Sequence, residues 1–368
     1  MKKLNEVELV STGTYLPGEP VPFDKIEEVI GKFDQAPPRI IKMIEKLRPM
    51  AKELIGVKQC HFAVDPKTKK LTESNTSMAV KASKAALKKA EMNPEDIDCI
   101  FYGNLMPDHQ TPPTSTFIQQ ELGIENCAEI EVHSNCTGIT KLLQIASDSL
   151  RVGRYRNVLV AYSQLSSAYL MADNFNQNKV RTESLLLRWF LADGAGAAIL
   201  KAKDEVESGI NLFYVYNESV GAKRAPGMWL NLGTPNFNLP RAFENGTHHF
   251  EQDYRMVNDI GPDIFFNGFE KMLRQSGVKG EEINHVIATL PSNKFWDLGK
   301  KVFAERYSVP ADKWYSTIGH KGYNGAATIL VALDEMIGKG VFKPKDILTC
   351  ITIESSKWMV GGFFLKYL

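Results

Sequence analysis

The sequence predicts an α/β protein built from two similar halves, and two observations support this prediction. First, short apolar runs alternate with segments of helical periodicity, which is typical of sheets that helices cover on both faces. Second, residues 87–107 and 273–293 resemble each other at a constant offset of 186, each with the end of an amphipathic helix, an acidic turn and a buried strand. We therefore expect one half at 1–205 and the other at 206–368.

A second pair of stretches matches at nearly the same offset. Residues 148–163, DSLRVGRYRNVLVAYS, and 334–352, DEMIGKGVFKPKDILTCIT, both contain a helix end, a glycine-containing turn, a basic and aromatic connection and a β-rich strand. Two matches at one offset favour duplication over coincidence. The predicted strands lie, in chain order, within 97–103, 157–163, 196–200, 283–290, 346–353 and 361–368.

Two segments fall outside the repeat. Residues 36–55, APPRIIKMIEKLRPMAKELI, predict a basic amphipathic helix inserted in the first half and interrupted at Pro49, because proline removes a helical hydrogen bond. One face of this helix is either simply exposed to solvent or functional. In the functional case the helix is a lid, or it presents a basic surface to an acidic carrier protein. Residues 220–262 are rich in Gly, Pro, Asn and His, and they predict a long loop or cap in the second half.

Length, charge and cysteine usage are those of an ordinary soluble globular protein. The chain has 368 residues, 43% of them hydrophobic and 24% charged, and a net charge of +1, so neither nucleic acid nor an anionic membrane is indicated as a partner. The first residues do not form a signal peptide, and no run approaches the ~18 apolar residues of a membrane span. An odd number of scattered cysteines argues against a disulfide framework or a zinc site and favours the cytoplasm. The five are Cys60, Cys99, Cys127, Cys136 and Cys350.

Cys136 stands at a junction where a reactive thiol is one of two possibilities. In EVHSNCTGITKLLQIASDSL (131–150) it separates a polar run from a long helical run, so it is either a small buried hydrophobic residue or a nucleophile. A helix N-terminus lowers a thiol pKa and stabilises an oxyanion, which favours the nucleophile. An offset of 187 leads from Cys136 to Tyr323, beside Asn324, in a loop that also precedes an apolar helix.

Histidines near these positions are candidate bases. If the halves pack about a pseudo-twofold axis, His320 and Asn324 lie on the loop opposite Cys136. In the alternative interpretations, His320 is a structural loop residue and Asn324 is a helix N-cap. His133 is a weaker candidate, because side chains three residues apart on an extended run need not converge. The adjacent histidines at 248–249 have no further ligands nearby in the sequence, so no metal site is expected.

Five stretches carry a family resemblance: IGVKQCHFA (55–63), NCTGI (135–139), ADGAGAAIL (192–200), GAATILVALDEMIGKGVFKPKD (325–346) and the glycine-containing last strand. Through them the chain resembles, over nearly its whole length, the ketoacyl synthase III-like enzymes (3-oxoacyl-acyl-carrier-protein synthase III) of the thiolase superfamily. The resemblance implies a thiolase-like five-layered αβαβα fold, a homodimer and an active-site cysteine that accepts an acyl group; Cys136 matches that cysteine. It also implies an acyl carrier protein or CoA thioester as donor and no resident cofactor.

The family pattern changes where a second catalytic group is expected. Residues 290–293 read Leu-Pro-Ser-Asn where the family usually has His-Gln-Ala-Asn, and Tyr323 takes the place of a later asparagine. In the family, that histidine and asparagine stabilise the enolate formed when malonyl thioester loses carbon dioxide. A minority of the family carries its histidine on the later loop and transfers acyl groups without decarboxylation. The stretch GHKGYNG (319–325) resembles that loop. The resemblance therefore implies Cys136, His320 and Asn324 as catalytic residues, with Asn324 orienting the imidazole.

The donor side of the pattern changes as well. Met50 and Leu54 stand where a tryptophan and an arginine often clasp the CoA adenine, and residues 355–357, Ser-Ser-Lys, replace a glycine run near the oxyanion hole. The neighbouring helix is basic, which favours a carrier-bound donor over free CoA. Its cationic residues are Arg39, Lys42, Lys46, Arg48 and Lys52.

Two functions remain open. The first is an acyltransferase or condensing enzyme that forms an acyl-Cys136 thioester and passes the acyl group to a small-molecule or carrier-bound acceptor, in fatty-acid, polyketide or related secondary-metabolite biosynthesis. Within it, carbon–carbon condensation and transfer without decarboxylation are both open. The alternative is a non-catalytic partner subunit of a ketosynthase heterodimer, which the altered residues 290–293 favour and the retained NCTG opposes.

Overall fold

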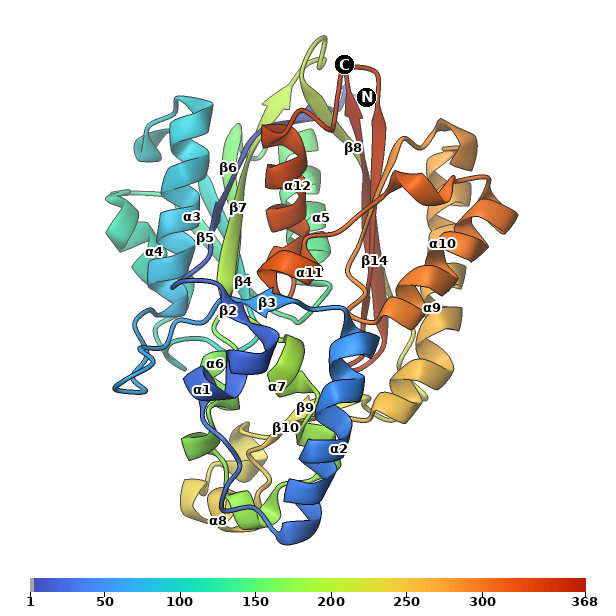
Figure 1. Ribbon diagram of the computed structural model, residues 1–368. Helices are drawn as coiled ribbons and strands as arrows, with labels where there is room; N and C mark the ends of the chain where they lie inside the picture. Colours follow the sequence, from blue (N-terminus) through green and yellow to red (C-terminus); the bar gives the residue numbers. More distant parts are fainter. Residues whose placement is uncertain (1–2) are drawn as a thin grey trace.

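The computed structural model describes residues 3–368, and a ten-stranded sheet runs through its centre (Figure 1). The strand order is β5-β4-β6-β7-β1-β8-β14-β13-β11-β12. The strands of the first half are β1 (Glu6–Tyr15), β4 (Cys99–Asn104), β5 (Ala128–His133), β6 (Asn157–Gln164) and β7 (Gly194–Lys203). Those of the second half are β8 (Ile210–Ser219), β11 (His285–Ala288), β12 (Trp314–Tyr315), β13 (Ile347–Glu354) and β14 (Met359–Tyr367).

The strand order is symmetric about its centre. β4 pairs in parallel with β5 and β6, and β11 pairs in parallel with β12 and β13, while β7 and β14 are antiparallel to their neighbours. The two halves join where β1 and β8 pair for two residues, Glu8 with Asn211 and Leu9 with Ile210. The two predicted halves are confirmed by this arrangement. We propose the boundary between them at residues 205 and 206, in the connection between β7 and β8.

The helices complete five layers. α5 (Gly138–Arg151) and α12 (Ala327–Gly338) lie between the two five-stranded walls (Figure 1). α3 (Asn75–Ala90) and α4 (Thr114–Leu122) cover the outer face of the first wall, and α9 (Tyr254–Ser276) covers the outer face of the second, with α10 (Asn293–Tyr307) beside it. The layers therefore run αβαβα, as predicted. α12 is apolar around nearly its whole circumference, because sheet covers it on both sides.

A smaller group of elements, here named the cap, lies at the end of the walls where α5 and α12 begin (Figure 1). Its helices are α1 (Ile26–Ile30), α2 (Pro38–Ile55), α6 (Ser167–Leu170), α7 (Leu187–Phe190), α8 (Leu239–Asn245) and α11 (Ile318–Lys321). Its strands are β2 (Val21–Pro22), β3 (Gln59–Cys60), β9 (Met228–Leu230) and β10 (Phe250–Gln252). The cap has its own apolar core, and Cys136 packs against that core.

Two predictions about the cap need correction. The interruption expected at Pro49 is wrong, because α2 runs unbroken from Pro38 to Ile55 with Pro49 inside it. Burial of Ile40, Ala51 and Ile55 supports α2 on both sides of the proline and offsets the lost hydrogen bond. Residues 220–262 are a cap as expected but not one long loop, since they hold β9, α8, β10 and the first turns of α9. Within residues 3–368, no helix combines the length and apolar character needed to cross a membrane.

Candidate active site

Cys136 lies in the turn that connects β5 to α5. The turn packs against Tyr162 of β6, whose hydroxyl donates to the Ser134 carbonyl at 2.7 Å. Gly138, the first residue of α5, permits this approach: a Cβ there would lie 2.5 Å from the Tyr162 ring. The NCTG motif thus places the cysteine and its following helix against a fixed aromatic wall.

The Cys136 side chain opens into a cavity of about 220 Å³ between the walls and the cap. Leu54 and Ile55 at the end of α2 and Lys294 at the start of α10 also line it, and Leu54 and Lys294 are exposed, so this side is its mouth. The lining is predominantly apolar, with a few polar groups near the cysteine. The apolar lining includes Leu105, Leu186, Leu187, Phe190, Leu191, Met228, Phe250, Val257, Leu290, Phe295 and Ile353. The polar lining includes Asn135, Gln164, Gln252, Thr289, Tyr323 and Ser355.

The Tyr323 hydroxyl lies against the Cys136 thiol at the cavity. Backbone bonds hold Tyr323 on both sides, since its N–H donates to the Phe190 carbonyl at 3.0 Å and its carbonyl accepts from Ala192 N–H at 2.9 Å. Burial and the neighbouring thiol raise the pKa of Tyr323 well above its ordinary value. Tyr323 is therefore a phenol at neutral pH, a hydrogen-bond donor and not a base.

Two threonines fix the backbone beneath the cysteine. The Thr352 hydroxyl on β13 donates to the Cys136 carbonyl at 3.3 Å and lies 2.6 Å from the Thr289 hydroxyl. Thr289 in turn contacts the Tyr323 hydroxyl. The second half thus contacts the turn that holds Cys136 through both a strand and a loop.

The Cys136 thiol is less acidic than the sequence suggests. Burial raises the pKa of Cys136 to about 12; the carboxylate of Glu354 adds to this rise, and the Tyr323 hydroxyl opposes it. The expectation that the helix N-terminus lowers this pKa is therefore wrong. The main physical reason is the burial of the thiol, and the Glu354 carboxylate at the start of α5 is the second.

That carboxylate belongs to Glu354, at the end of β13, which is only 5% exposed. Its Oε2 accepts from Ser134 Oγ (2.9 Å), Asn135 N–H (3.2 Å), Thr137 N–H (3.2 Å) and Thr137 Oγ1 (2.7 Å). Burial opposes the charge, but the Lys141 ammonium and hydrogen bonds from Ser356 and Thr137 hold the pKa of Glu354 below its ordinary value. Glu354 is therefore a carboxylate at neutral pH.

His320 does not reach the cavity, and this corrects its prediction as the base at Cys136. Its side chain is 48% exposed, and Nε2 lies 3.2 Å from Glu335 of α12. Glu335 also binds Lys321 at 2.7 Å and Lys339 at 2.8 Å. His320 thus belongs to a surface ion cluster that fastens α11 to α12.

Asn324 is buried but contacts neither His320 nor the cavity. Its Nδ2 donates to the Asp193 carbonyl at 2.8 Å, and its backbone N–H donates to Thr328 Oγ1 at 2.8 Å. It therefore ties the start of α12 to the start of β7. Its predicted role in orienting a catalytic imidazole is wrong, and it does not cap α12, whose N-cap residue is Ala326.

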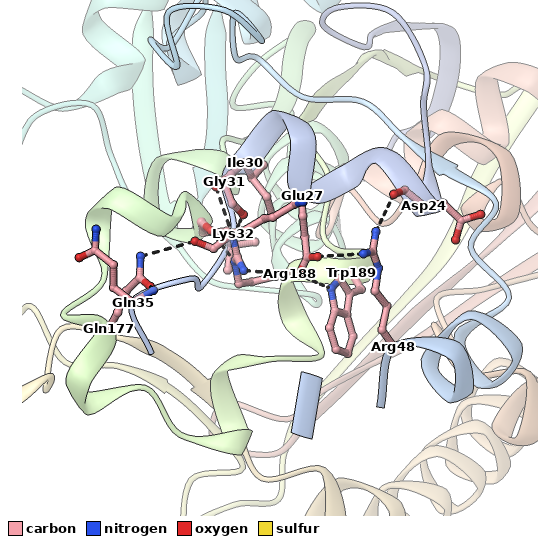
Figure 2. Close-up of polar contacts among 11 residues, drawn as sticks. Asp24, Glu27, Ile30, Gly31, Lys32, Gln35, Arg48, Gln177, Arg188 and Trp189 are labelled. Atoms are coloured by element: carbon pink, nitrogen blue, oxygen red, sulfur yellow. Dashed lines mark hydrogen bonds and ion pairs between the residues drawn. The ribbon is translucent and has the colours of Figure 1, made fainter. Parts of the chain in front are cut away.

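The cavity wall is fixed from behind by a buried ion network (Figure 2). Leu187 and Phe190 of α7 line the cavity, and because they lie three residues apart on the helix, Arg188 and Trp189 face away from it. Arg188 is 1% exposed, and its Nη1 lies 4.0 Å from Oε1 of Glu27 on α1. Trp189 donates to the same oxygen at 3.4 Å.

Arg188 also satisfies three backbone carbonyls that end short elements of the cap. Nε donates to Leu170 at 2.9 Å, and Nη2 donates to Ile30 at 3.2 Å and to Gly31 at 2.6 Å. On the far side of Glu27, Arg48 of α2 lies 3.0 Å from Oε2 (Figure 2). One carboxylate therefore links the cavity wall on α7 to the mouth helix α2.

The sequence drew attention to Cys136, whose role as a nucleophile stays a prediction, but not to most of the residues around it. The repeat offset led from Cys136 to Tyr323, which was the available signal for the contact that the structure shows. Thr289 and Gln164 stand at the ends of predicted strands, where side chains of a site gather. No comparable signal in the sequence pointed to Glu354. It lies 218 residues from Cys136 in the chain, and the residues around it have the pattern of an ordinary buried strand.

Comparison with known proteins shows which family this chain is similar to. Residues 130–218, which include Cys136, match the family described as 3-oxoacyl-[acyl-carrier-protein (ACP)] synthase III. The beta-ketoacyl-[acyl-carrier-protein] synthase III of Caldanaerobacter subterraneus subsp. tengcongensis is 27% identical over 93% of this chain and 92% of its own. The chain is similar to these synthases over nearly its whole length. The synthase III of Aquifex aeolicus is 26% identical to the chain, over 98% of this chain and 99% of its own.

Solved structures share the fold of this synthase III-like chain. The condensing enzyme AbyA1, named for tetronic acid, superposes with a TM-score of 0.80 at 23% identity, covering 98% of this chain and 99% of its own. OleA of Xanthomonas campestris superposes with a TM-score of 0.79 at 15% identity, covering both chains fully. Similarity at this level of identity concerns the fold.

The positions that depart from the family pattern gather at the cavity of this synthase III-like chain. Leu290 is buried in the cavity lining, and Tyr323 lies against the cysteine. Leu54 is 52% exposed at the mouth. The substitutions therefore lie at the cavity and its mouth, not in the distant core.

Proposed function

We propose that this protein is an acyltransferase or condensing enzyme that takes an acyl group from a thioester onto Cys136 and passes it to a second substrate in fatty-acid, polyketide or related biosynthesis. One observation carries the proposal: the cysteine that matches the family motif opens into an apolar cavity. An apolar cavity beside a nucleophile suits an aliphatic acyl chain better than a charged one.

The loading step is an exchange between two thioesters. Sγ of Cys136 attacks the donor carbonyl, the bond to the donor sulfur breaks, and the thiol proton leaves on the released donor thiol. Among residues 3–368, the backbone N–H groups of Cys136 and Ser355 donate to no other residue, and both residues line the cavity. They are the candidate donors to the oxyanion that forms at the carbonyl.

The second step differs from the family pattern. Leu290 and Tyr323 replace the imidazole and the amide that stabilise an enolate, and neither supplies a base, because one side chain is aliphatic and the other a phenol with a raised pKa. We therefore infer an acceptor that arrives as a nucleophile, so that no decarboxylation is needed in this cavity. Acyl loading, which needs neither missing group, is the first step to test.

The test is the release of donor thiol in the absence of any acceptor. Thioesters with short, medium and long linear chains, and a malonyl thioester as a charged control, are mixed with equimolar protein. We expect one equivalent of thiol from an apolar donor and none from the malonyl donor, because the cavity lining offers no cation away from its mouth. If no apolar donor released its thiol, the alternative function, a non-catalytic partner subunit, would be favoured. The protonated Cys136 thiol and the missing histidine agree with that alternative.

We predict that carrier-bound donors react faster than the same acyl-CoA. The basic face of α2 adjoins the cavity mouth, but Arg48 pairs with Glu27 and Lys52 pairs with Asp24, so Arg39, Lys42 and Lys46 supply the exposed charge. Reversal of Lys42 and Lys46 to Glu should lower kcat/KM for the carrier donor by about tenfold at low salt and leave the CoA donor unchanged.

Reversal of Lys84, exposed on α3 on the outer face of the first wall, is the matched control. Equal rates with carrier and CoA donors in the wild-type protein would contradict the carrier prediction.

We predict that the protein is a homodimer that pairs through the sheet edge at β5. This strand ends the ten-stranded order, five of its six residues are half-buried and the sixth, His133, is exposed, so its outer backbone groups are open to a second copy. Sedimentation should give a dimer at micromolar concentration, and Ile130→Lys, on this strand, should shift it towards monomer. A stable monomer of the wild-type protein would contradict the prediction.

A further inference from the structure

Glu354 is the polar residue at this site that neither the family pattern nor the acyl-loading step explains. It ends β13 in the second half, yet four of its hydrogen bonds reach Ser134, Asn135 and Thr137 in the first half. These three residues surround Cys136 in the chain. The carboxylate therefore binds the nucleophile turn from both sides of the cysteine.

The hydrogen bonds leave one backbone group of the turn unused. Asn135 N–H and Thr137 N–H both point to Glu354 Oε2, while Cys136 N–H, between them, donates to no other residue of the described chain. The other oxygen, Oε1, accepts from Ser356 Oγ at 2.6 Å. Glu354 thus fixes the turn so that the cysteine keeps both its thiol and its N–H for the cavity.

The carboxylate also changes the electrostatics at the start of α5. A helix of this length carries partial positive charge at its N-terminus, which favours a nearby thiolate. Here Glu354 occupies that place, and Lys141, one turn into α5, faces the carboxylate and donates to Ser134 Oγ at 2.7 Å. The other titratable groups that face the cysteine are the phenols of Tyr162, Tyr169 and Tyr323.

We propose that Glu354 is a positioning residue for Cys136: its carboxylate holds the 134–137 turn and its charge opposes the thiolate, so that the cysteine enters the reaction as a thiol. The proposal rests on Cys136 being the acylated residue. It predicts low reactivity of the unloaded cysteine towards soluble electrophiles, since the thiolate is the reactive form. The thiol proton then leaves only as the donor thiol departs.

The test measures alkylation of Cys136 by iodoacetamide as a function of pH, with the modified peptide followed by mass spectrometry. Glu354→Gln removes the charge, while its amide oxygen still accepts from the turn and its amide nitrogen can donate to Ser356. We expect it to alkylate about tenfold faster at pH 8 and to titrate about one unit lower. Lys141→Met should alkylate more slowly than wild type, because it removes the cation that faces the carboxylate.

Glu335→Gln is the matched control, since Glu335 is a half-buried carboxylate that binds cations of α11 and α12 and is not in contact with the cysteine. It should alkylate at the wild-type rate. The proposal is overturned if Glu354→Gln and wild type share one rate and one pH midpoint, or if Lys141→Met also accelerates the reaction. Should Glu354→Gln fail to fold, the Lys141→Met profile alone decides. Alkylation does not require acyl transfer, so failure of the proposed function would appear separately, as absent thiol release.

Discussion

Replacing Cys136 by alanine should leave a folded protein that takes up no acyl group. Of the five cysteines, Cys136 is the one that lines the cavity. Cys60, Cys99 and Cys350 are buried in the protein interior, and burial raises the pKa of each. None of them is placed to receive an acyl chain from the cavity. The loss of transfer should therefore be complete and not partial.

Intact mass after incubation with an apolar donor measures this effect. Cys127→Ala is the matched control, because Cys127 is the other half-buried cysteine and lies away from the cavity. It should acquire the acyl mass as the wild-type protein does. Far-ultraviolet circular dichroism and the unfolding midpoint should show that Cys136→Ala keeps its fold, with a change in stability of about 1 kcal/mol. Acylation of the Cys136→Ala protein would place the nucleophile elsewhere.

Replacing Arg188 by alanine should destabilise the protein by about 3–5 kcal/mol. The substitution strips Glu27, which is 7% exposed, of one of its two cations and leaves three buried carbonyls without their donor. It also removes the guanidinium that lies 3.9 Å from the centre of the Phe33 ring. Each loss exposes a polar group to an interior that offers no replacement partner.

Urea unfolding measures this effect, and Lys52→Ala is its control. Lys52 pairs with Asp24 across the same junction between α1 and α2, but both side chains are at least half exposed, so its removal should cost at most about 1 kcal/mol. If Arg188→Ala lost no more stability than Lys52→Ala, the network in Figure 2 would not be what holds the cavity wall.

The duplicated α/β fold could be predicted from the sequence because both halves repeat the same alternation of buried apolar strands and covering helices. The six predicted strands all fall in the central sheet, since apolar runs such as those of β4 and β11 are buried on both faces. The prediction did not include β1 and β8, which join the halves. Polar side chains in β1 bond to the helices, Ser11 to the Ala86 carbonyl and Thr12 to Asp334, and a search for apolar runs passes over such a strand.

In the site, too, local sequence patterns indicate some features, while only the packing of the chain sets the others. The sequence could single out Cys136 because the motif and the helix start adjoin it in the chain, and its role as the nucleophile stays a prediction. The prediction for His320 failed because chain proximity to Tyr323 does not set the direction of a side chain. A short helix and Gly322, with φ of +73°, turn the chain between them, so Tyr323 faces the cavity and His320 faces Glu335. Glu354 meets the cysteine only through the packing of the two halves, which no local pattern reports.

The location of the acyl group tests the central claim most directly. The wild-type protein is incubated with an apolar acyl thioester, quenched in acid, digested and analysed by mass spectrometry of its cysteine-containing peptides. The account predicts one acyl group per chain, on the peptide that holds Cys136, in the same amount as the donor thiol released. An acyl group on any other residue, or thiol release with no acylated peptide, would contradict it.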